Sequence, residues 1–476
     1  MGFPRPVAPV TITGDRLMDD WTQTLGTAPL LLIAAAAILV VLVLIIRFKV
    51  HAFLTLIVVS LLTALATGIP TGELLEVLTG GFGRTLANVA LLIGLGAMLG
   101  KLVEVSGGAK SLAEGLIGLF GEKRASLALG LASLAMGFPM FFDAGLVVML
   151  PVIFAVARRL GGNVLAYGIP AAAAFSVMHV FVPPHPGPVS ATELYGANLG
   201  LVLLVGLVLV GPVWYVSGYL WGRYVGKKYD LPVPELFGST VEDDPKMAPP
   251  SAGTVIAVLL LPLVLIFLNT GSTSLVSAGA VDGEAGWVQA LALIGSAPVA
   301  LLISVLVAMV VLGTRRGQTG SALEKILDSS LGPVCSVILI TGAGGMFGAV
   351  LNASGIGDAL SESLTSVGMP IILAAYIVSL ALRVAQGSAT VALITTAGLM
   401  APAVESGDFS GMQIACITLA TAAGSVFGSH VNDSGFWLVG RLMGMDVKTT
   451  LKTWTVQQSI QSVIAFVLAA ALFSVV

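Results

Sequence analysis

Two Gly-rich stretches of this chain repeat each other: LIGLGAMLGKLVEVSGGAKSLAEGL at 92–116 and ITGAGGMFGAVLNASGIGDALSESL at 340–364. At an offset of 248 residues, nine of the 25 aligned positions are identical. These positions are Gly94/Gly342, Gly96/Gly344, Met98/Met346, Gly100/Gly348, Ser106/Ser354, Gly107/Gly355, Leu112/Leu360, Glu114/Glu362 and Leu116/Leu364. With three more residues of offset, Pro151 falls on Pro402 and His179 falls on His430. Each half of the chain therefore runs in the same order: a helix, a broken apolar stretch, a proline and a histidine.

The composition places the chain in a lipid bilayer. Of its 476 residues, 57% are apolar and only 10% are charged, against about 25% in an average soluble domain. Such a composition predicts an integral membrane protein with many spans. The net charge is −3 and no long basic run occurs, which excludes nucleic acid as a main partner. The two cysteines, Cys335 and Cys416, form no CxxC pair, so we expect neither a disulfide framework nor a metal site.

Ten apolar stretches are long enough to cross a bilayer. They lie at about 28–46, 50–68, 85–105, 164–182, 199–221, 252–269, 288–312, 331–353, 411–430 and 455–475. The first is a transmembrane helix rather than a cleaved signal, because a polar N-terminal extension at 1–27 precedes it. We expect two transmembrane halves, 28–221 and 251–476, joined by a polar cytoplasmic loop at 222–250.

Two further apolar stretches are interrupted halfway. The segment 126–157 is broken at Gly137-Phe138-Pro139, and the segment 369–405 is broken between Arg383 and Gly387. Broken helices at membrane depth are tolerated only where they line a cavity or are buried in protein. Each segment is either one kinked helix or a hairpin of two half-helices that returns to its own side.

The distribution of positive charge favours hairpins, because basic residues mark cytoplasmic loops. If both segments are hairpins, 18 of the 22 basic residues lie inside, and only Arg5, Arg16 and Arg84 lie outside, with Arg383 in the second hairpin. The inside set is Arg47, Lys49, Lys101, Lys110, Lys123, Arg124, Arg158, Arg159, Arg223, Lys227, Lys228, Lys246, Arg315, Arg316, Lys325, Arg441, Lys448 and Lys452. The predicted fold is therefore an all-α polytopic membrane protein with inverted repeats, about ten transmembrane helices and two opposed re-entrant hairpins, as in secondary transporters.

Polar residues at membrane depth mark a substrate or ion path, because ionisable groups are costly in hydrocarbon. They are Asp143, His179, His185, Arg383, Gln386, Ser388, Thr390, His430, Asn432, Asp433 and Ser434. Ser388 and Thr390 begin a returning half-helix, whose N-terminal amides favour an anion. Arg383 needs a partner at that depth, either an aspartate or a substrate carboxylate. His185 fits a conformational role in its Pro-rich loop as well as a functional one.

Four motifs occur in order along nearly the whole chain: GFPMFFD ending at Asp143, VPPHPGP around His185, RVAQGSAT at 383–390 and GSHVNDSGFW at 428–437. Together they resemble the gluconate permease family of bacterial proton symporters, within the wider ion transporter superfamily. The resemblance implies proton-driven import of gluconate, idonate or a similar small acid such as D-serine across the bacterial inner membrane. It also implies an elevator-type mechanism and a homodimer. The polar extension at 1–27 has no match in this family.

The predicted function is thus a secondary active transporter for a small sugar acid, not an enzyme. We expect a substrate site formed by Arg383, Gln386, Ser388, Thr390, His430, Asn432, Ser434 and His179. Burial can bring a carboxylate into a useful titration range, so Asp143 or Asp433 is expected to carry the coupling proton, with no other cofactor.

Two alternatives remain open from the residues. One is a sodium-coupled carboxylate transporter, with Asn432, Asp433 and backbone carbonyls as the ion site. The other is an intramembrane aspartyl hydrolase, because Gly355-Ile-Gly-Asp358 is similar to the signature of that class, with Asp230 as its partner.

Overall fold

The computed structural model describes residues 21–160, 163–229, 231–234, 249–277, 280–359, 363, 369–430 and 433–476. These residues form helices and turns, and no strand occurs among them. The prediction of an all-α protein is confirmed. Residues 1–20 of the predicted N-terminal extension, and residues 230 and 235–248 of the predicted loop at 222–250, lie outside the described residues.

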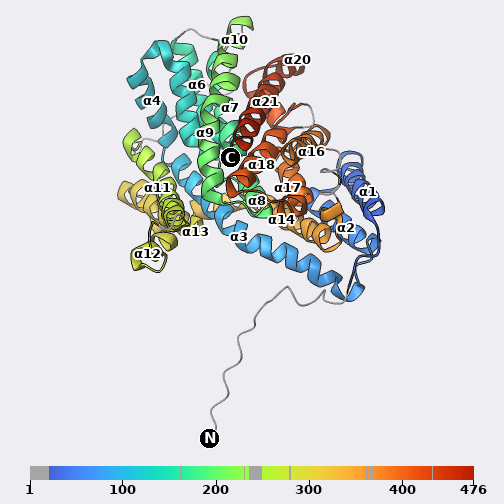
Figure 1. The fold of residues 1–476 in the computed structure, drawn as a ribbon. Helices are drawn as coiled ribbons and strands as arrows, with labels where there is room; N and C mark the ends of the chain where they lie inside the picture. The colour runs from blue at the N-terminus through green and yellow to red at the C-terminus, as the bar shows by residue number, and fades with distance from the viewer. Residues whose placement is uncertain are drawn as a thin grey trace.

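The first half of the chain supplies the helices drawn in blue to green in Figure 1. They are α1 (Thr27–Ile46), α2 (Ala52–Ala66), α3 (Thr71–Val105), α4 (Gly108–Phe120), η1 (Glu122–Arg124), α5 (Ala125–Gly137), α6 (Phe142–Arg159), α7 (Val164–Phe181), α8 (Pro186–Leu194), α9 (Leu199–Trp214), η2 (Tyr215–Leu220) and α10 (Trp221–Lys228). The last three are continuous, so this helix runs seven residues beyond its predicted end at 221.

The second half supplies the helices drawn in yellow to red. They are α11 (Ala252–Ser277), α12 (Gly286–Ile294), α13 (Ala297–Ala308), η3 (Met309–Gly313), η4 (Thr314–Arg316), α14 (Gly320–Ala353), α16 (Ile371–Gln386), α17 (Ala389–Glu405), α18 (Gly411–Gly424), α19 (Ser434–Leu442), α20 (Val447–Thr450), η5 (Leu451–Thr455) and α21 (Val456–Phe473).

The helix boundaries repeat between the halves. The helices α6 and α17 begin 247 residues apart, at Phe142 and Ala389, and α8 and α19 begin 248 residues apart, at Pro186 and Ser434. The equivalent long helices α3 and α14 pack on each other. A Cβ added to Gly94 would lie 3.8 Å from Leu331, near the start of α14, whereas one added to Gly81 would lie 2.6 Å from Ala349, near its end. The two helices therefore run antiparallel, which is the relation expected of an inverted repeat.

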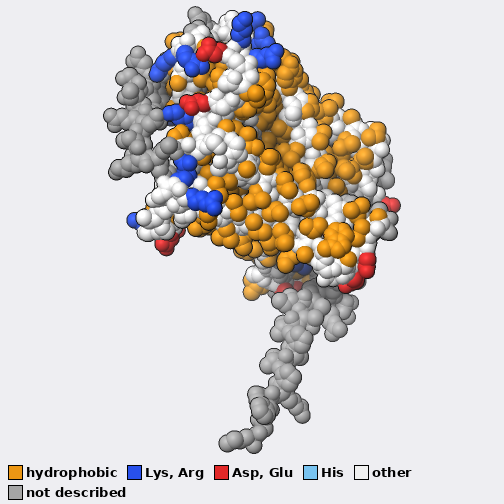
Figure 2. Space-filling view, turned by 90° about the vertical axis from the view of Figure 1, so that its left-hand side faces the viewer, with side chains coloured by type: hydrophobic (Ala, Val, Ile, Leu, Met, Phe, Trp, Pro, Cys, Tyr) orange, Lys and Arg blue, Asp and Glu red, His pale blue; other side chains and the backbone are white. Residues whose placement is uncertain are grey.

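Eight helices in the described part of the chain are long and apolar enough to cross a membrane. The predicted spans at 50–68 and 411–430 correspond to α2 and α18, which have only 15 and 14 residues. The predicted number of about ten crossings is therefore not confirmed, although a multi-span membrane protein is. Figure 2 shows one face of the molecule, where apolar side chains cover the middle and Lys and Arg side chains gather at the upper and left edges.

One predicted span, 288–312, is wrong as a single helix. It divides at Gly295 and Ser296 into α12 and α13, and Pro298 lies in the first turn of α13. Proline has no N–H to bond to the preceding turn, so it begins a new helix rather than continuing one. A Cβ at Gly295 would lie 2.3 Å from the carbonyl oxygen of Leu265, so this break also lets α12 pack closely on α11.

Each of the two interrupted segments divides into two helices. In the first pair, α5 and α6 flank the four residues 138–141, and Arg159 forms an ion pair with Glu122 at 3.1 Å. This contact brings the outer ends of the segment together. In the second pair, α16 ends at Gln386 and is followed by Gly387, whose φ of +87° suits glycine, and α17 begins after Ser388. The helices α16 and α17 pack on each other.

Candidate substrate site

The chain breaks converge on one cavity of about 660 Å³. The first break contributes residues 139–142, the second contributes residues 387–389, and the turn before α19 contributes Asp433. The long helices α3 and α14 also line the cavity, through Gly100, Lys101 and Ser329, among others. A volume of this size suits a small-molecule ligand.

The second break presents the start of α17 to this cavity. Ser388 is the N-cap of α17, and its hydroxyl accepts a hydrogen bond from the backbone N–H of Val391 at 3.3 Å. Ser388, Ala389 and Thr390 line the cavity. The first N–H groups of a helix have no partner within the helix and carry partial positive charge, so this end of the cavity favours an anion.

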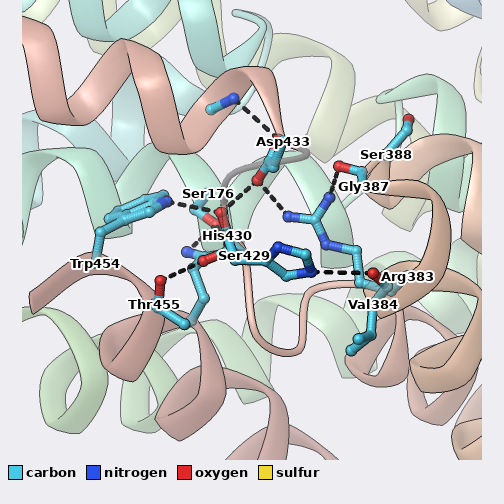
Figure 3. A network of polar contacts seen from close by, with 12 residues as sticks. Ser176, Arg383, Val384, Gly387, Ser388, Ser429, His430, Asp433, Trp454 and Thr455 are labelled. Atoms are coloured by element: carbon cyan, nitrogen blue, oxygen red, sulfur yellow. Dashed lines mark hydrogen bonds and ion pairs between the residues drawn. The ribbon is translucent and has the colours of Figure 1, made fainter. Parts of the chain in front are cut away.

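Arg383 lies beside that helix start, on the last turn of α16. Its side chain is only 3% exposed. It donates from Nη1 to the carbonyl oxygen of Gly387 and from Nη2 to Oδ2 of Asp433 (Figure 3). Its Nε has no partner among the described residues. Arg383 thus joins the second break to the turn before α19 and keeps one donor unused.

Asp433 is held by a second set of contacts. It is the N-cap of α19, and its Oδ1 accepts from the backbone N–H of Gly435 at 2.9 Å. Its Oδ2 also accepts from the hydroxyl of Ser429, which in turn accepts from Nε1 of Trp454 at 3.1 Å. A chain of hydrogen bonds therefore runs from Trp454 through Ser429 and Asp433 to Arg383 (Figure 3).

The other predicted acid, Asp143, occupies a different setting. It lies in the first turn of α6, lines the cavity and is exposed to it. No described residue forms an ion pair or hydrogen bond with its carboxylate. The two acids thus differ in a way that the sequence did not reveal: Asp433 is paired with Arg383, and Asp143 is open to the cavity.

His179 and His185 pair across the break between α7 and α8. Their Nδ1 atoms lie 3.3 Å apart, and Nε2 of His185 lies 2.6 Å from the carbonyl oxygen of Gly137 at the end of α5. The ring of Phe141 packs edge-on against both imidazoles. His179 lines the cavity, whereas His185 is 3% exposed and ties α8 to the first break.

One predicted site residue, His430, is placed differently. His430 is absent from the cavity wall, and its Nε2 donates to the carbonyl oxygen of Val384 at 3.0 Å. Asn432 and the side chain of Gln386 lie outside what the structure describes. Ser434, by contrast, lines the cavity beside Asp433.

Several polar residues of the cavity wall were missing from the predicted site. Lys101 and Glu104 form an ion pair at 2.7 Å on α3, and Ser176 and Gln458 contact each other across α7 and α21. A signal was present for Gln458, because three glutamines, at 457, 458 and 461, interrupt an apolar stretch. The predicted site was instead built from residues next to chain breaks, so it omitted polar residues inside continuous helices.

Comparison with known proteins decides the family. Residues 29–476 match the GntP family permease profile. The inner membrane permease YgbN of Escherichia coli is 40% identical, over 95% of this chain and all of that protein. The gluconate permease of Pseudomonas aeruginosa is 39% identical, over 92% of this chain and 96% of that protein. The chain belongs to the GntP family of permeases.

This GntP permease is a transporter rather than an enzyme, and the hydrolase alternative is abandoned. Its family and its spanning helices identify it as a multi-pass protein of the inner membrane. A further relative, the Gnt-II system L-idonate transporter of Escherichia coli, is 36% identical over 91% of this chain and 96% of that protein.

Two solved transporters share the fold of this GntP permease. The YdaH transporter of Alcanivorax borkumensis superposes with a TM-score of 0.59 at 15% identity, over 86% of this chain and 89% of that one. MtrF of Neisseria gonorrhoeae superposes with a TM-score of 0.60 at 16% identity, over 90% and 96% respectively. At this identity the likeness concerns the fold alone.

Proposed function

We propose that this GntP permease imports gluconate or a related small sugar acid by proton symport. The observation that carries the proposal is the pairing of Arg383 with Asp433 in the cavity, beside the start of α17. The relatives named for gluconate and L-idonate transport support the substrate class.

The carboxylate of the substrate would bind between Arg383 and the first N–H groups of α17. A guanidinium fork can hold a carboxylate through two parallel hydrogen bonds, and Arg383 has an unused Nε beside the Nη2 that now contacts Asp433. The helix start adds partial positive charge from a second direction. Both groups are fixed by the protein before the substrate arrives, which lowers the cost of binding.

Coupling would follow from competition for Arg383. While Asp433 is charged, it occupies the guanidinium. When Asp433 takes up a proton, its attraction for Arg383 weakens, and the substrate carboxylate can replace it. Proton binding and anion binding then favour each other, which is the reciprocal linkage that symport requires.

The broken segments would be the moving parts of this transporter. We propose that α5–α6 and α16–α17 are re-entrant hairpins entering from opposite sides and that they move with the cavity in an elevator-type cycle, in a homodimer. The proposal is supported by the matching helix starts of the two halves and by the antiparallel packing of α3 and α14.

Uptake by the purified protein in liposomes tests the function. With an inward proton gradient and no sodium, labelled gluconate should accumulate, and a protonophore should abolish the accumulation. A sodium gradient at equal pH should drive none. Accumulation that needs sodium would instead support a sodium-coupled carboxylate transporter. Counterflow with idonate or D-serine but not gluconate would reassign the substrate.

A further inference from the structure

The wall of the cavity contributed by α7 and α21 holds a second group of polar side chains. Ser176 and His179 lie three residues apart on α7, so they share one face of that helix, and Gln458 of α21 contacts Ser176. All three line the cavity. Figure 3 draws Ser176 on the opposite side of Asp433 from Gly387.

Ser176 has its two acceptor positions in use and its proton available. Its Oγ accepts from Nε2 of Gln458 at 2.9 Å and from Nε2 of Gln461 at 3.2 Å. The acceptor within reach of its own proton, among described residues, is Oε1 of Gln458 at 3.3 Å. Hydroxyl hydrogen bonds are normally about 2.7–2.8 Å long, so this proton is free to bond to a better-placed ligand oxygen.

Gln458 has an unused acceptor, whereas Ser176 has an unused donor. Its Nε2 donates to Ser176 and, at 2.7 Å, to Oε1 of Gln457. These two bonds use both hydrogens of the Gln458 amide. Its Oε1 keeps only the 3.3 Å contact with Ser176 within the described chain. The amide oxygen of Gln458 is therefore an acceptor without a good donor.

The tautomers of the histidine pair leave a second free acceptor. A carbonyl oxygen can only accept, so Nε2 of His185 carries the hydrogen bonded to Gly137, and its Nδ1 is an acceptor. His179 must then donate from its Nδ1 to that atom. Neutral imidazole has one N–H, so Nε2 of His179 holds a lone pair, and no described residue bonds to it.

Buried amides of α21 fix Ser176 and Gln458 in position. Gln457 and Gln461 are fully buried, and Gln457 donates to Oε1 of Gln461 at 3.1 Å and to the hydroxyl of Ser217 at 3.4 Å. Buried amides are costly unless they are hydrogen-bonded, so this network fixes Gln458 and Ser176 in position. Such preorganisation is typical of a binding site.

We propose that Ser176, His179 and Gln458 form the subsite that binds the hydroxyl groups of the sugar acid. This inference rests on the proposed function. One donor and two acceptors match a polyol chain, because each hydroxyl both donates and accepts. Arg383 and the start of α17 would bind the carboxylate end, and this subsite would select acids that carry hydroxyls further along the chain.

Competition against labelled gluconate tests the subsite. The competitors are unlabelled gluconate and 2-hydroxyhexanoate, which has the same chain length and carboxylate but lacks four hydroxyls. Ser176→Ala and Gln458→Leu should each weaken gluconate binding about ten-fold, as expected for a lost hydrogen bond, and should change 2-hydroxyhexanoate binding less than two-fold. Replacing His179 by Phe should act in the same way, and His179→Gln, which restores an acceptor, should recover part of the affinity.

The matched control is Ser462→Ala. Ser462 is a buried serine, as Ser176 is, and it lies on α21, as Gln458 does. Its hydroxyl bonds to the hydroxyl of Tyr376 at 3.1 Å, and neither residue lines the cavity. Ser462→Ala should change the binding of neither competitor. A merely structural network predicts equal losses for both competitors, and that result, or unchanged gluconate binding in folded Ser176→Ala and Gln458→Leu, overturns the subsite. A parent protein that binds no sugar acid at all overturns the proposed function and the subsite together.

Discussion

Arg383 connects two chain breaks through a single planar group. Its guanidinium contacts the carbonyl oxygen of Gly387 and the carboxylate of Asp433 while its side chain is 3% exposed. A buried charge is tolerated when it is paired and hydrogen-bonded, and Asp433 meets that need here. At the residue scale, the proposed transport mechanism depends on whether Asp433 or the substrate carboxylate binds the guanidinium of Arg383.

Arg383→Lys should weaken substrate binding roughly ten- to a hundred-fold without unfolding the protein. Lysine keeps the charge, but a single ammonium cannot present the two parallel donors of the guanidinium, and a charge-assisted hydrogen bond contributes about 1.5–3 kcal/mol. The measurement is gluconate affinity by isothermal titration. The control is Arg441→Lys, because Arg441 is exposed and packs on Trp437. Affinity within two-fold of the parent would make Arg383 a structural partner of Asp433 only.

Asp433→Asn should abolish pH-driven accumulation while substrate exchange continues. Asparagine can still cap α19, so the fold is kept, but it cannot gain or lose the coupling proton. Uptake with a proton gradient and counterflow without one measure the two activities separately.

Asp446→Asn is the matched control for that change. Asp446 caps α20 and accepts from the N–H of Thr449 at 2.8 Å, away from the cavity. Hydrogen bonding by Thr449 lowers the pKa of Asp446, so it stays charged at neutral pH. We expect normal pH-driven uptake in this variant. Normal uptake in both Asp433→Asn and Asp143→Asn would remove the two acids as proton carriers.

At the scale of elements, the breaks in the helices position the site. Gly100 of α3 packs directly on the first break, since a Cβ there would lie 2.3 Å from the carbonyl oxygen of Pro139. A Cβ added to Gly348, the equivalent residue on α14, would lie 3.2 Å from the carbonyl oxygen of Gly398 on α17. Packing of small residues replaces the hydrophobic effect as the force between helices in lipid. The repeated glycines thus hold both broken segments against the long helices.

Cysteines at positions 122 and 160 should react from the same, cytoplasmic side of the membrane. The ion pair between Glu122 and Arg159 brings these ends together, and neighbouring basic residues mark the inside. The variants are Glu122→Cys and Leu160→Cys in a Cys335→Ser background, because Cys335 is exposed. Labelling with a membrane-impermeant maleimide in oriented vesicles is the measurement. Labelling from opposite sides would show that 126–157 crosses the membrane.

At the scale of the whole molecule, two cavities lie along α14, one lined by residues between 329 and 337 and the other by residues between 345 and 352. Ser329 lines the cavity with the candidate site, and Asn352 lines a second one of about 400 Å³ that also includes Arg84 and Glu193. A helical rise of about 1.5 Å per residue separates these two positions by roughly 35 Å, close to the thickness of a bilayer. Ser329 and Asn352 are therefore far enough apart to report on opposite sides of the membrane.

Ser329→Cys should label from the cytoplasmic side, and Asn352→Cys should label from the opposite side. Lys101 and Ser329 belong to the end of the molecule whose basic residues are predicted to be cytoplasmic. Gluconate should protect Ser329→Cys by occupying the cavity and should leave Asn352→Cys labelling unchanged, which makes the second variant the control. Labelling of both cysteines from one side would refute this orientation of the cavities.

The amino-acid sequence alone is enough to predict the membrane environment, the repeat and the places where helices break. These are local or periodic properties: apolar stretches of spanning length, glycines at a fixed offset, and proline or glycine beside a charge. It also indicated Arg383, Ser388, Thr390 and Asp433, because polar groups next to such breaks have few other roles in lipid.

Which polar groups contact each other could be learned from the three-dimensional structure alone. From the sequence, the partner of Arg383 could be Asp433, Asp143 or the substrate. The structure pairs it with Asp433, which lies 50 residues further along the chain. The sequence offered no reason to join Gln458 to Ser176, 282 residues apart, or to remove His430 from the cavity wall. These contacts depend on how each helix is rotated and packed, and the hydropathy of a single segment predicts neither.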